Sequence, residues 1–265
     1  MKPILLAKAR FRGASPEEFR ELLKETLGFD VGMPFEGVER ILCIQPHPDD
    51  CELAIGGTLA RLSREGKEVE YLTLTDGSAG SRELPPEELR KVRRREQERA
   101  AEIIGVKKLL WLGYTDTKLP YSDDVREELI GIIRSERPEL VLAPDPWLPY
   151  EVHPDHRKAG LLAGEAAFFS ALPNVGEGNP WDVPLLGFYY TDNPNHIEDV
   201  TGFLKLKLKA LKAHESQFKG DWNSWEVFVR SVARFYGEIG GFKYGEGLRI
   251  LPTVLFHANP LAGVL

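Results

Sequence analysis

The chain alternates between two patterns of apolar and polar positions, and each pattern is typical of one kind of element. Short apolar runs, as in buried strands, cover residues 40–45, 68–75, 109–112 and 140–143. Segments with an apolar residue every three or four positions, as on one face of a helix, cover residues 52–65, 85–104, 122–136 and 154–170. Strands that alternate with helices predict an α/β fold with a Rossmann-like, mostly parallel sheet and helices on both faces.

The N-terminal region predicts one further helix, at the periphery of the fold. Ser15 is a suitable helix N-cap, Pro16 suits the first turn, and Gly28 suits the end of a helix. We therefore expect a helix over residues 15–28, outside the alternating pattern of strands and helices.

Beyond residue 185 the pattern becomes less regular. It predicts a strand at 185–191, helices near 201–217 and 224–240, and a final strand near 249–256. No internal repeat or low-complexity linker divides the chain. We interpret residues 1–265 as a single domain that the segment 185–265 completes.

Composition and charge exclude several classes of protein. The chain has 265 residues, 42% of them hydrophobic, so it can bury a large core. A net charge of −7 argues against a nucleic-acid partner, which a surface rich in Lys and Arg would bind. No apolar run is long enough to span a bilayer, and the first residues lack a signal-peptide pattern. Cys43 and Cys51 are too few for a disulfide framework, so we expect a soluble, cytoplasmic protein without a membrane partner.

Polar residues follow each of the first four predicted strands. These residues are His47 to Asp50, Asp76-Gly77, Tyr114 to Asp116, and Asp145 to His156. In open α/β sheets, ligands bind beyond the carboxyl ends of the strands, where these loops gather. We therefore expect the active site at this edge, where the two histidine clusters meet.

The two histidine clusters have the composition of a divided metal site. One is His47-Pro48-Asp49-Asp50, and the other is His153-Pro154-Asp155-His156. Imidazole and carboxylate are ligands that a hydrolytic Zn²⁺ prefers, and a catalytic site needs three of them with one position left open. The same set of ligands also suits Fe²⁺.

The order of these motifs resembles that of a known family. The motifs are Gln45 to Asp50, Gly56-Gly57, Asp76-Gly77, Arg93-x-x-Glu96, His153 to His156, and Ala213 to Gln217. Together they resemble the LmbE-like/PIG-L family of zinc-dependent N-acetylglucosamine deacetylases, over about residues 38–218. Cys51 and the stretch 145–151 are most similar to the archaeal diacetylchitobiose deacetylases.

The resemblance implies roles for five residues of the two clusters. It implies that His47, Asp50 and His156 bind Zn²⁺ and that Asp49 is the general base. Zinc lowers the pKa of a bound water from about 15.7 to about 7, so that a carboxylate can remove its proton. His153 would stabilise the oxyanion or protonate the leaving amine.

Further residues are implied to support the site or to contact the substrate. Asp155 would orient a histidine. Arg93 and Asp116 match positions that hold sugar hydroxyls in relatives, although other arginines of the run 90–95 compete with Arg93. Trp147 would stack on a sugar ring, and packing within its proline-rich loop explains it equally well.

The predicted activity is zinc-dependent hydrolysis of the N-acetyl group of an N-acetylglucosamine-containing sugar, with release of acetate. The expected substrate is N,N′-diacetylchitobiose or N-acetylglucosamine, and the resemblance also implies a homo-oligomer, a hexamer in the diacetylchitobiose group. Two alternatives are a deacetylase of another conjugate, such as the glycoside precursor of a thiol, and a non-catalytic, metal-dependent sugar-binding protein. Asp49 favours catalysis, because a binding site has no need of a base.

Two other chemistries lack support. Ser78 lies between Gly77 and Ala79, without the G-x-S-x-G spacing of a serine nucleophile. Gly56-Gly57 does not open the G-x-G-x-x-G fingerprint of dinucleotide binding.

Overall fold

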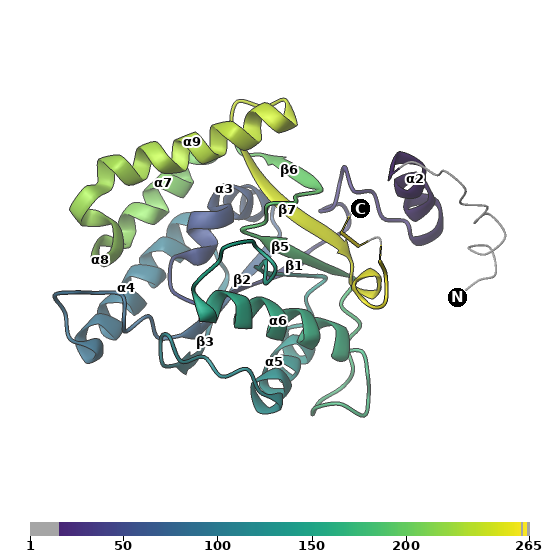
Figure 1. The fold of residues 1–265 in the computed structure, drawn as a ribbon, viewed down its shortest axis with the longest axis horizontal. Helices are drawn as coiled ribbons and strands as arrows, with labels where there is room; N and C mark the ends of the chain where they lie inside the picture. Colours follow the sequence, from purple (N-terminus) through teal and green to yellow (C-terminus); the bar gives the residue numbers. More distant parts are fainter. Residues whose placement is uncertain (1–15, 261, 264–265) are drawn as a thin grey trace.

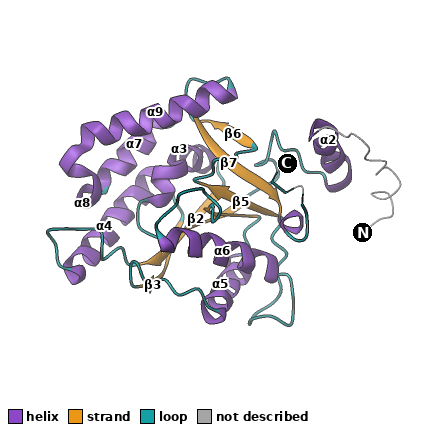
Figure 2. Ribbon diagram, viewed as in Figure 1, coloured by secondary structure: helices purple, strands orange, loops and turns teal. Residues whose placement is uncertain are grey.

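The computed structural model describes residues 16–260 and 262–263, and in them seven strands form one sheet (Figures 1 and 2). Five neighbouring strands are parallel: β1 (Arg40–Gln45), β2 (Glu68–Thr75), β3 (Lys108–Tyr114), β4 (Leu140–Pro144) and β5 (Leu185–Tyr189). β7 (Gly245–Pro252) pairs with β5 in antiparallel fashion, and β6 (His196–Asp199) pairs with β7, also in antiparallel fashion. The prediction of an α/β fold with a mostly parallel sheet is confirmed.

Helices cover both faces of the sheet, as predicted (Figure 1). One face carries α3 (Asp50–Arg64), α4 (Pro86–Ile104) and α7 (Leu204–Ala213). The other face carries α5 (Asp123–Glu136) and α6 (Pro154–Phe169). The remaining helices are α2 (Pro16–Leu27), α8 (Glu215–Phe218), α9 (Trp222–Gly240) and two 3₁₀ turns, η1 (Lys219–Asp221) and η2 (Thr253–Phe256). The α2 helix lies to one side of the sheet, and Ser15, its expected N-cap, is outside the described residues.

Alternate residues of the central strands enter two separate cores. On β1, Ile41 and Cys43 join the core beneath α3 and α4, whereas Leu42 and Ile44 join the core beneath α5 and α6. All four side chains are buried. Because successive strand residues point to opposite faces, a strand that is covered on both sides must be apolar throughout. This explains the continuous apolar run that predicted β1.

The strand order places a topological switch point between β1 and β4. The order is β3-β2-β1-β4-β5-β7-β6, so the chain moves outward in one direction from β1 and in the other direction from β4. The loops after β1 and β4 therefore diverge at the carboxyl edge and leave a crevice there. The two histidine clusters lie in these two loops.

The C-terminal part departs from the predicted boundaries. The last strand begins at Gly245 rather than near 249, and it ends at Pro252. A charged residue, Glu246, is not typical of a buried strand, so the sequence did not predict this start. In the structure Glu246 is buried and accepts hydrogen bonds from the backbone of Thr58 and from Lys207. β6 was not predicted, because its sequence His-Ile-Glu-Asp contains one strongly apolar residue.

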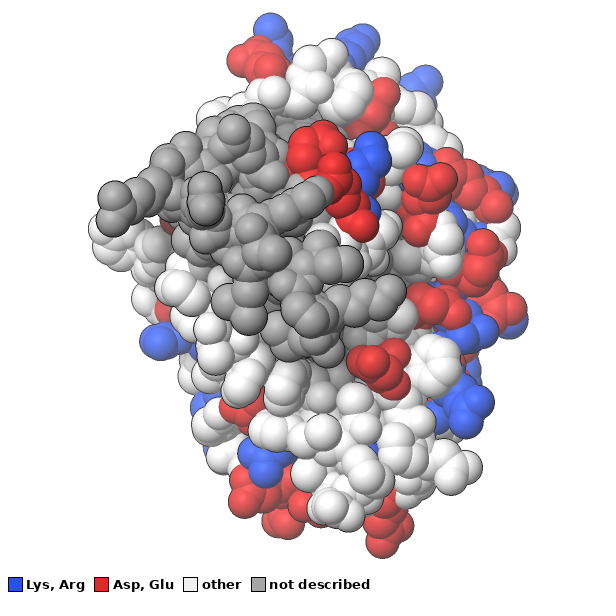
Figure 3. Space-filling model, turned by 90° about the vertical axis from the view of Figure 1, so that its right-hand side faces the viewer, with Lys and Arg blue, Asp and Glu red and all other residues white. Residues whose placement is uncertain are grey.

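The surface carries charged side chains of both signs (Figure 3). On the described part of the face in Figure 3, acidic and basic side chains are interspersed. Among the described residues, no helix is long and apolar enough to cross a membrane.

Candidate active site

The loop from β1 to α3 brings a strained aspartate next to a helix start. Asp49 has φ 107° and ψ −19°, a left-handed conformation that is unusual for a residue with a Cβ. Such strain costs about 1–3 kcal/mol and persists where the surroundings hold it in place. Asp50 begins α3, and its Oδ2 accepts a hydrogen bond from the backbone N–H of His47, at 2.9 Å. The turn thus directs the two adjacent carboxylates in different directions.

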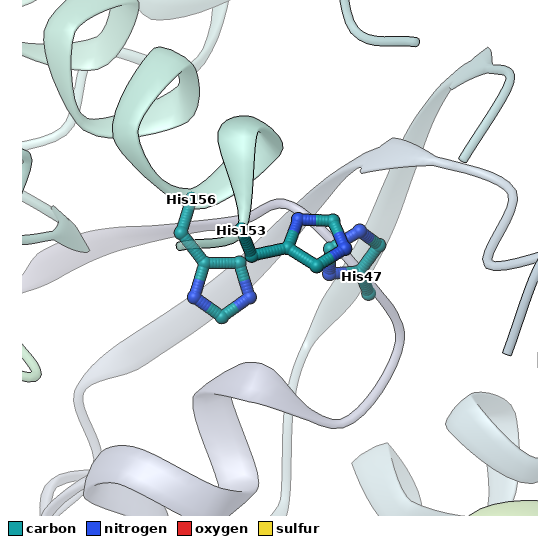
Figure 4. Close-up of side chains that lie close together, drawn as sticks. All are labelled: His47, His153 and His156. Carbon is teal, nitrogen blue, oxygen red and sulfur yellow. The ribbon is translucent and has the colours of Figure 1, made fainter. Parts of the chain in front are cut away.

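The second cluster stands at the N-terminus of α6. His153 is the N-cap of this helix, with Pro154 in its first turn, and its Nδ1 accepts a hydrogen bond from the N–H of Asp155 at 3.3 Å. Residues three apart on a helix face the same way, so His153 and His156 both point towards the β1 loop. Figure 4 shows their rings gathered with that of His47. The centroids of the three rings are 4.5 to 5.3 Å apart. The predicted meeting of the two clusters is confirmed.

Asp50 lies between two of these histidines. Its Oδ2 is 3.3 Å from Nδ1 of His47, and its Oδ1 is 3.4 Å from Nε2 of His156. Burial acts to raise the pKa of Asp50, but His156 and His47 outweigh it and lower that pKa. Asp50 thus faces one imidazole nitrogen of each histidine, and imidazole nitrogens and carboxylates are donors that a divalent cation accepts.

Further ligand atoms surround the same point. Within the described residues, His47, His153 and His156 offer ligand atoms within 4.8 Å of one another, and so do His47, Asp116, His153 and Asp155. Nε2 of His47 is 3.1 Å from Asp116 Oδ1 and 3.4 Å from Asp155 Oδ2. This histidine and aspartate group can hold a metal ion, and the sequence-based choice of Asp50 as the third ligand stays a prediction.

Asp49 and Asp116 have opposite electrostatic environments. Burial raises the pKa of Asp49 to about 6, although the nearby guanidinium of Arg93 lowers it. For Asp116, burial also acts to raise the pKa, but His47 outweighs it and the pKa falls to about 2. One carboxyl is therefore poised near neutrality and the other is held ionised, which suits a proton-transfer role for Asp49.

Arg93 and Trp147, the other residues predicted to contact substrate, lie in contrasting environments. Arg93 is buried on α4, and its Nη2 donates to Oδ2 of Asp49 at 3.0 Å. Trp147 packs edge-on against Phe188, with ring centroids 5.5 Å apart, yet its side chain remains 64% exposed. Sugar contacts by Arg93 and Trp147 stay predictions, and Trp147 presents an exposed aromatic surface in the loop that leads to His153.

Two residues around His156 were missed by the sequence analysis. Oε2 of Glu151 lies 3.1 Å from Nδ1 of His156, on the ring edge opposite to Asp50. Tyr190 stacks on the same imidazole, with an interplanar angle of 2°, and its hydroxyl donates to the carbonyl of Asp50 at 3.3 Å. A carboxylate two residues before a histidine cluster could have drawn attention to Glu151. Tyr190 follows a strand far along the chain, and no local pattern identifies it.

A known protein family matches the central part of the chain. Residues 42–167 match the PIG-L family, described as GlcNAc-PI de-N-acetylase. This segment spans the elements from β1 to α6 and contains both histidine clusters. The match therefore covers the part of the chain that builds the candidate site.

Individual relatives match over more of the chain. Diacetylchitobiose deacetylase of Thermococcus kodakarensis is 46% identical, with 94% of this chain and 96% of that protein covered. The solved structure of N,N′-diacetylchitobiose deacetylase from Pyrococcus horikoshii, complexed with its inhibitor, has a TM-score of 0.89, 46% identity, and coverage of 96% of this chain and 100% of that one. A conserved protein of Thermus thermophilus has a TM-score of 0.71 and 32% identity, with 80% of this chain and 93% of that one covered.

Proposed function

The chain belongs to the PIG-L family, and on this premise we propose that it is a carbohydrate N-deacetylase acting on N,N′-diacetylchitobiose. The observation that carries the proposal is the 46% identity to diacetylchitobiose deacetylase across nearly the full length of both chains. The clustered histidines and aspartates support it, because hydrolysis of an unactivated amide needs a strong electrophile and a base. The enzyme releases acetate and leaves a free amine on the sugar.

A divalent metal fits this site, and we assign Zn²⁺ to it. His47, Asp50 and His156 would hold the ion, since the nitrogens that face Asp50 belong to these two histidines. Bound zinc would polarise the amide carbonyl and lower the pKa of water. Glu151 and Tyr190 keep the imidazole of His156 in a single orientation.

The protein's own groups then move the protons. Asp49 takes a proton from the attacking water, whose oxygen forms a bond to the acetyl carbon. Nδ1 of His153 accepts the N–H of Asp155, so Nε2 carries the single ring proton and delivers it to the amide nitrogen, and the proton that Asp49 took from water then replaces it on His153. The C–N bond then breaks, and its electron pair leaves with the protonated amine. The products are acetate and the deacetylated sugar.

Substrate recognition falls to the rim of the site. Trp147 offers its exposed ring to a pyranose face, and Asp116 and Arg93 line the inner side towards Asp49. We further propose a single-domain, cytoplasmic protein that acts as a homo-oligomer, with a hexamer as the expected form.

The test is acetate release from diacetylchitobiose, N-acetylglucosamine and a glucosaminide conjugate. Enzyme is assayed as purified, after chelation, and after Zn²⁺ or Fe²⁺ is restored. We expect release from diacetylchitobiose that chelation abolishes and zinc restores. Faster release from the glucosaminide conjugate would assign the conjugate as the substrate in place of diacetylchitobiose. If folded, zinc-loaded protein binds the sugars but releases no acetate, the protein is a sugar-binding protein and not an enzyme.

A further inference from the structure

Two side chains of helix α4 form hydrogen bonds with both polar atoms of one peptide group in the β1 loop. Nη2 of Arg93 donates to the carbonyl of Pro48 at 2.5 Å, and Oε1 of Gln97 accepts the N–H of Asp49 at 3.0 Å. This carbonyl and this N–H belong to the same peptide plane. Arg93 and Gln97 are four residues apart, so they lie one above the other on a single face of the helix. The peptide that precedes Asp49 is therefore held against rotation from both sides.

We propose that Gln97 is a positioning residue for the reaction, acting through the backbone of Asp49. The inference rests on the proposed deacetylase function. Asp49 keeps a φ of 107° that a residue with a Cβ rarely adopts. Rotation of its peptide would relieve that strain and swing the carboxylate away. The hydrogen bond from Asp49 N–H to Gln97 opposes this rotation, because the rotated N–H would lose its buried partner.

The surroundings of Gln97 fix which end of its amide faces Asp49. Its Nε2 donates to Oε1 of Glu52 at 2.7 Å, and a carboxylate accepts hydrogen bonds but donates none. Gln45 donates from its Nε2 to Oε1 of Gln97 at 3.0 Å. Both neighbours therefore require the amide oxygen of Gln97 to point towards the β1 loop, and a flipped amide would break all three contacts.

The same network holds the far end of the loop. Oε1 of Gln45 accepts the N–H of Cys51 at 3.0 Å, and its Nε2 also donates to the hydroxyl of Thr73 at 2.9 Å. Gln45, Glu52 and Gln97 have no exposed surface. Water does not compete for these bonds, and in the low dielectric of the interior each of them is stronger than it would be in water. The two glutamines thus fix the backbone on both sides of Asp50.

Gln97 can be separated from the chemistry more cleanly than Arg93. Arg93 also touches the carboxylate of Asp49, so its loss would change the charge at the base itself. Gln97 is neutral, and its contact with Asp49 is to the backbone N–H. Replacing it tests orientation alone.

The experiment exchanges the hydrogen-bonding groups of two buried partners. Gln97→Met keeps the volume and removes the acceptor; we expect kcat to fall about 10- to 100-fold with KM and zinc content unchanged. The double variant Gln97→Glu with Glu52→Gln keeps the acceptor for Asp49 and reverses the donor, so most of the lost kcat should return. Glu98→Met, at an exposed position of the same helix, is the matched control and should behave as wild type.

Two results would overturn the proposal. One is wild-type kcat in Gln97→Met; the other is a folded, zinc-loaded double variant as slow as Gln97→Met. Thermal unfolding and metal content are measured for each protein. If Gln97→Met does not fold, the double variant is compared with the wild type instead, and a folded, zinc-loaded double variant whose kcat is about 10-fold or more below wild type would overturn the proposal. If the wild type releases no acetate, the proposed function fails. A crystal structure of Gln97→Met then tests whether Gln97 holds the peptide that precedes Asp49. An unchanged φ at Asp49 would overturn it.

Discussion

The two loops that form the site differ in how far the rest of the molecule constrains them. The β1 loop (residues 46–49) lies beneath α4, and His47 and the adjacent Asp50 are only 7% and 4% exposed. The β4 loop (residues 145–153) lies open, with Tyr150 99% and Val152 90% exposed. Both loops leave the same edge of the sheet. The proposed base Asp49 and the proposed ligand His47 lie in the covered loop, whereas the open loop presents surface to a substrate before it reaches His153 at the start of α6.

Burial explains why the covered loop is so densely hydrogen-bonded. A buried polar group without a partner costs about 1–3 kcal/mol, so each carboxylate and amide in the β1 loop needs a partner. The open loop escapes this requirement because water satisfies its groups. We therefore expect substitutions in the covered loop to affect the chemistry and substitutions of exposed side chains in the open loop, such as Trp147, to affect mainly binding.

The largest effect should come from a metal ligand in the covered loop. His47→Ala removes one of the proposed ligands, and two remaining protein ligands hold zinc poorly. We expect purified protein with little zinc and no acetate release, measured by metal analysis and by the acetate assay. Full zinc content in His47→Ala would remove this residue from the ligand set.

Asp49→Asn should separate catalysis from metal binding. The amide keeps the size of the side chain but cannot take a proton from water, so we expect kcat to fall about 10²- to 10⁴-fold. Zinc content should stay near that of the wild type. Turnover at the wild-type rate would exclude Asp49 as the base, and loss of zinc would assign it to the metal instead.

Glu151→Ala tests whether the open loop also supports the metal. Its carboxylate lies 3.1 Å from Nδ1 of His156, and loss of such a partner weakens metal affinity about 10- to 100-fold. Titration with a competing chelator measures this affinity. Glu151→Gln should lose less, since its amide oxygen can still accept a hydrogen bond. Equal metal affinity in the wild type, Glu151→Ala and Glu151→Gln would show that Glu151 does not support the metal.

The smallest effect should come from the exposed aromatic of the open loop. Trp147→Ala removes a stacking surface worth about 0.5–1.5 kcal/mol, so KM for diacetylchitobiose should rise several-fold while kcat changes little. Val152→Ala, in the same loop and 90% exposed, is the control and should leave KM unaltered. If Trp147→Ala has the wild-type KM for every sugar tested, packing against Phe188 is its whole role.

Much of the site was predictable because it follows strand ends. His47, Asp49 and Asp50 come directly after an apolar run, and the second cluster follows β4. The rule that carboxyl ends of parallel strands share one edge brings these segments together without any knowledge of side-chain contacts. The roles of the individual residues remain predictions for the variants above.

The supporting residues were not predictable in the same way. In the sequence, Gln97 is one polar residue in a charged helix, and Tyr190 is one aromatic residue of the predicted strand 185–191. Each acquires its contact from a segment distant in the chain, Asp49 for Gln97 and Asp50 for Tyr190. Residue type and local period reveal burial and secondary structure, but they carry no record of which distant group a side chain meets.

By itself, therefore, the sequence determined the alternation of strands and helices, the family, and the edge of the sheet where the chemistry lies. These depend on local periodicity and on motifs that are continuous in the chain. Only the tertiary structure decided that Asp49 is held in a strained conformation from α4, that His156 is oriented by Glu151 and Tyr190, and that the β4 loop stays open. These are properties of packing, which arise when distant segments exclude water from one another or leave it in place.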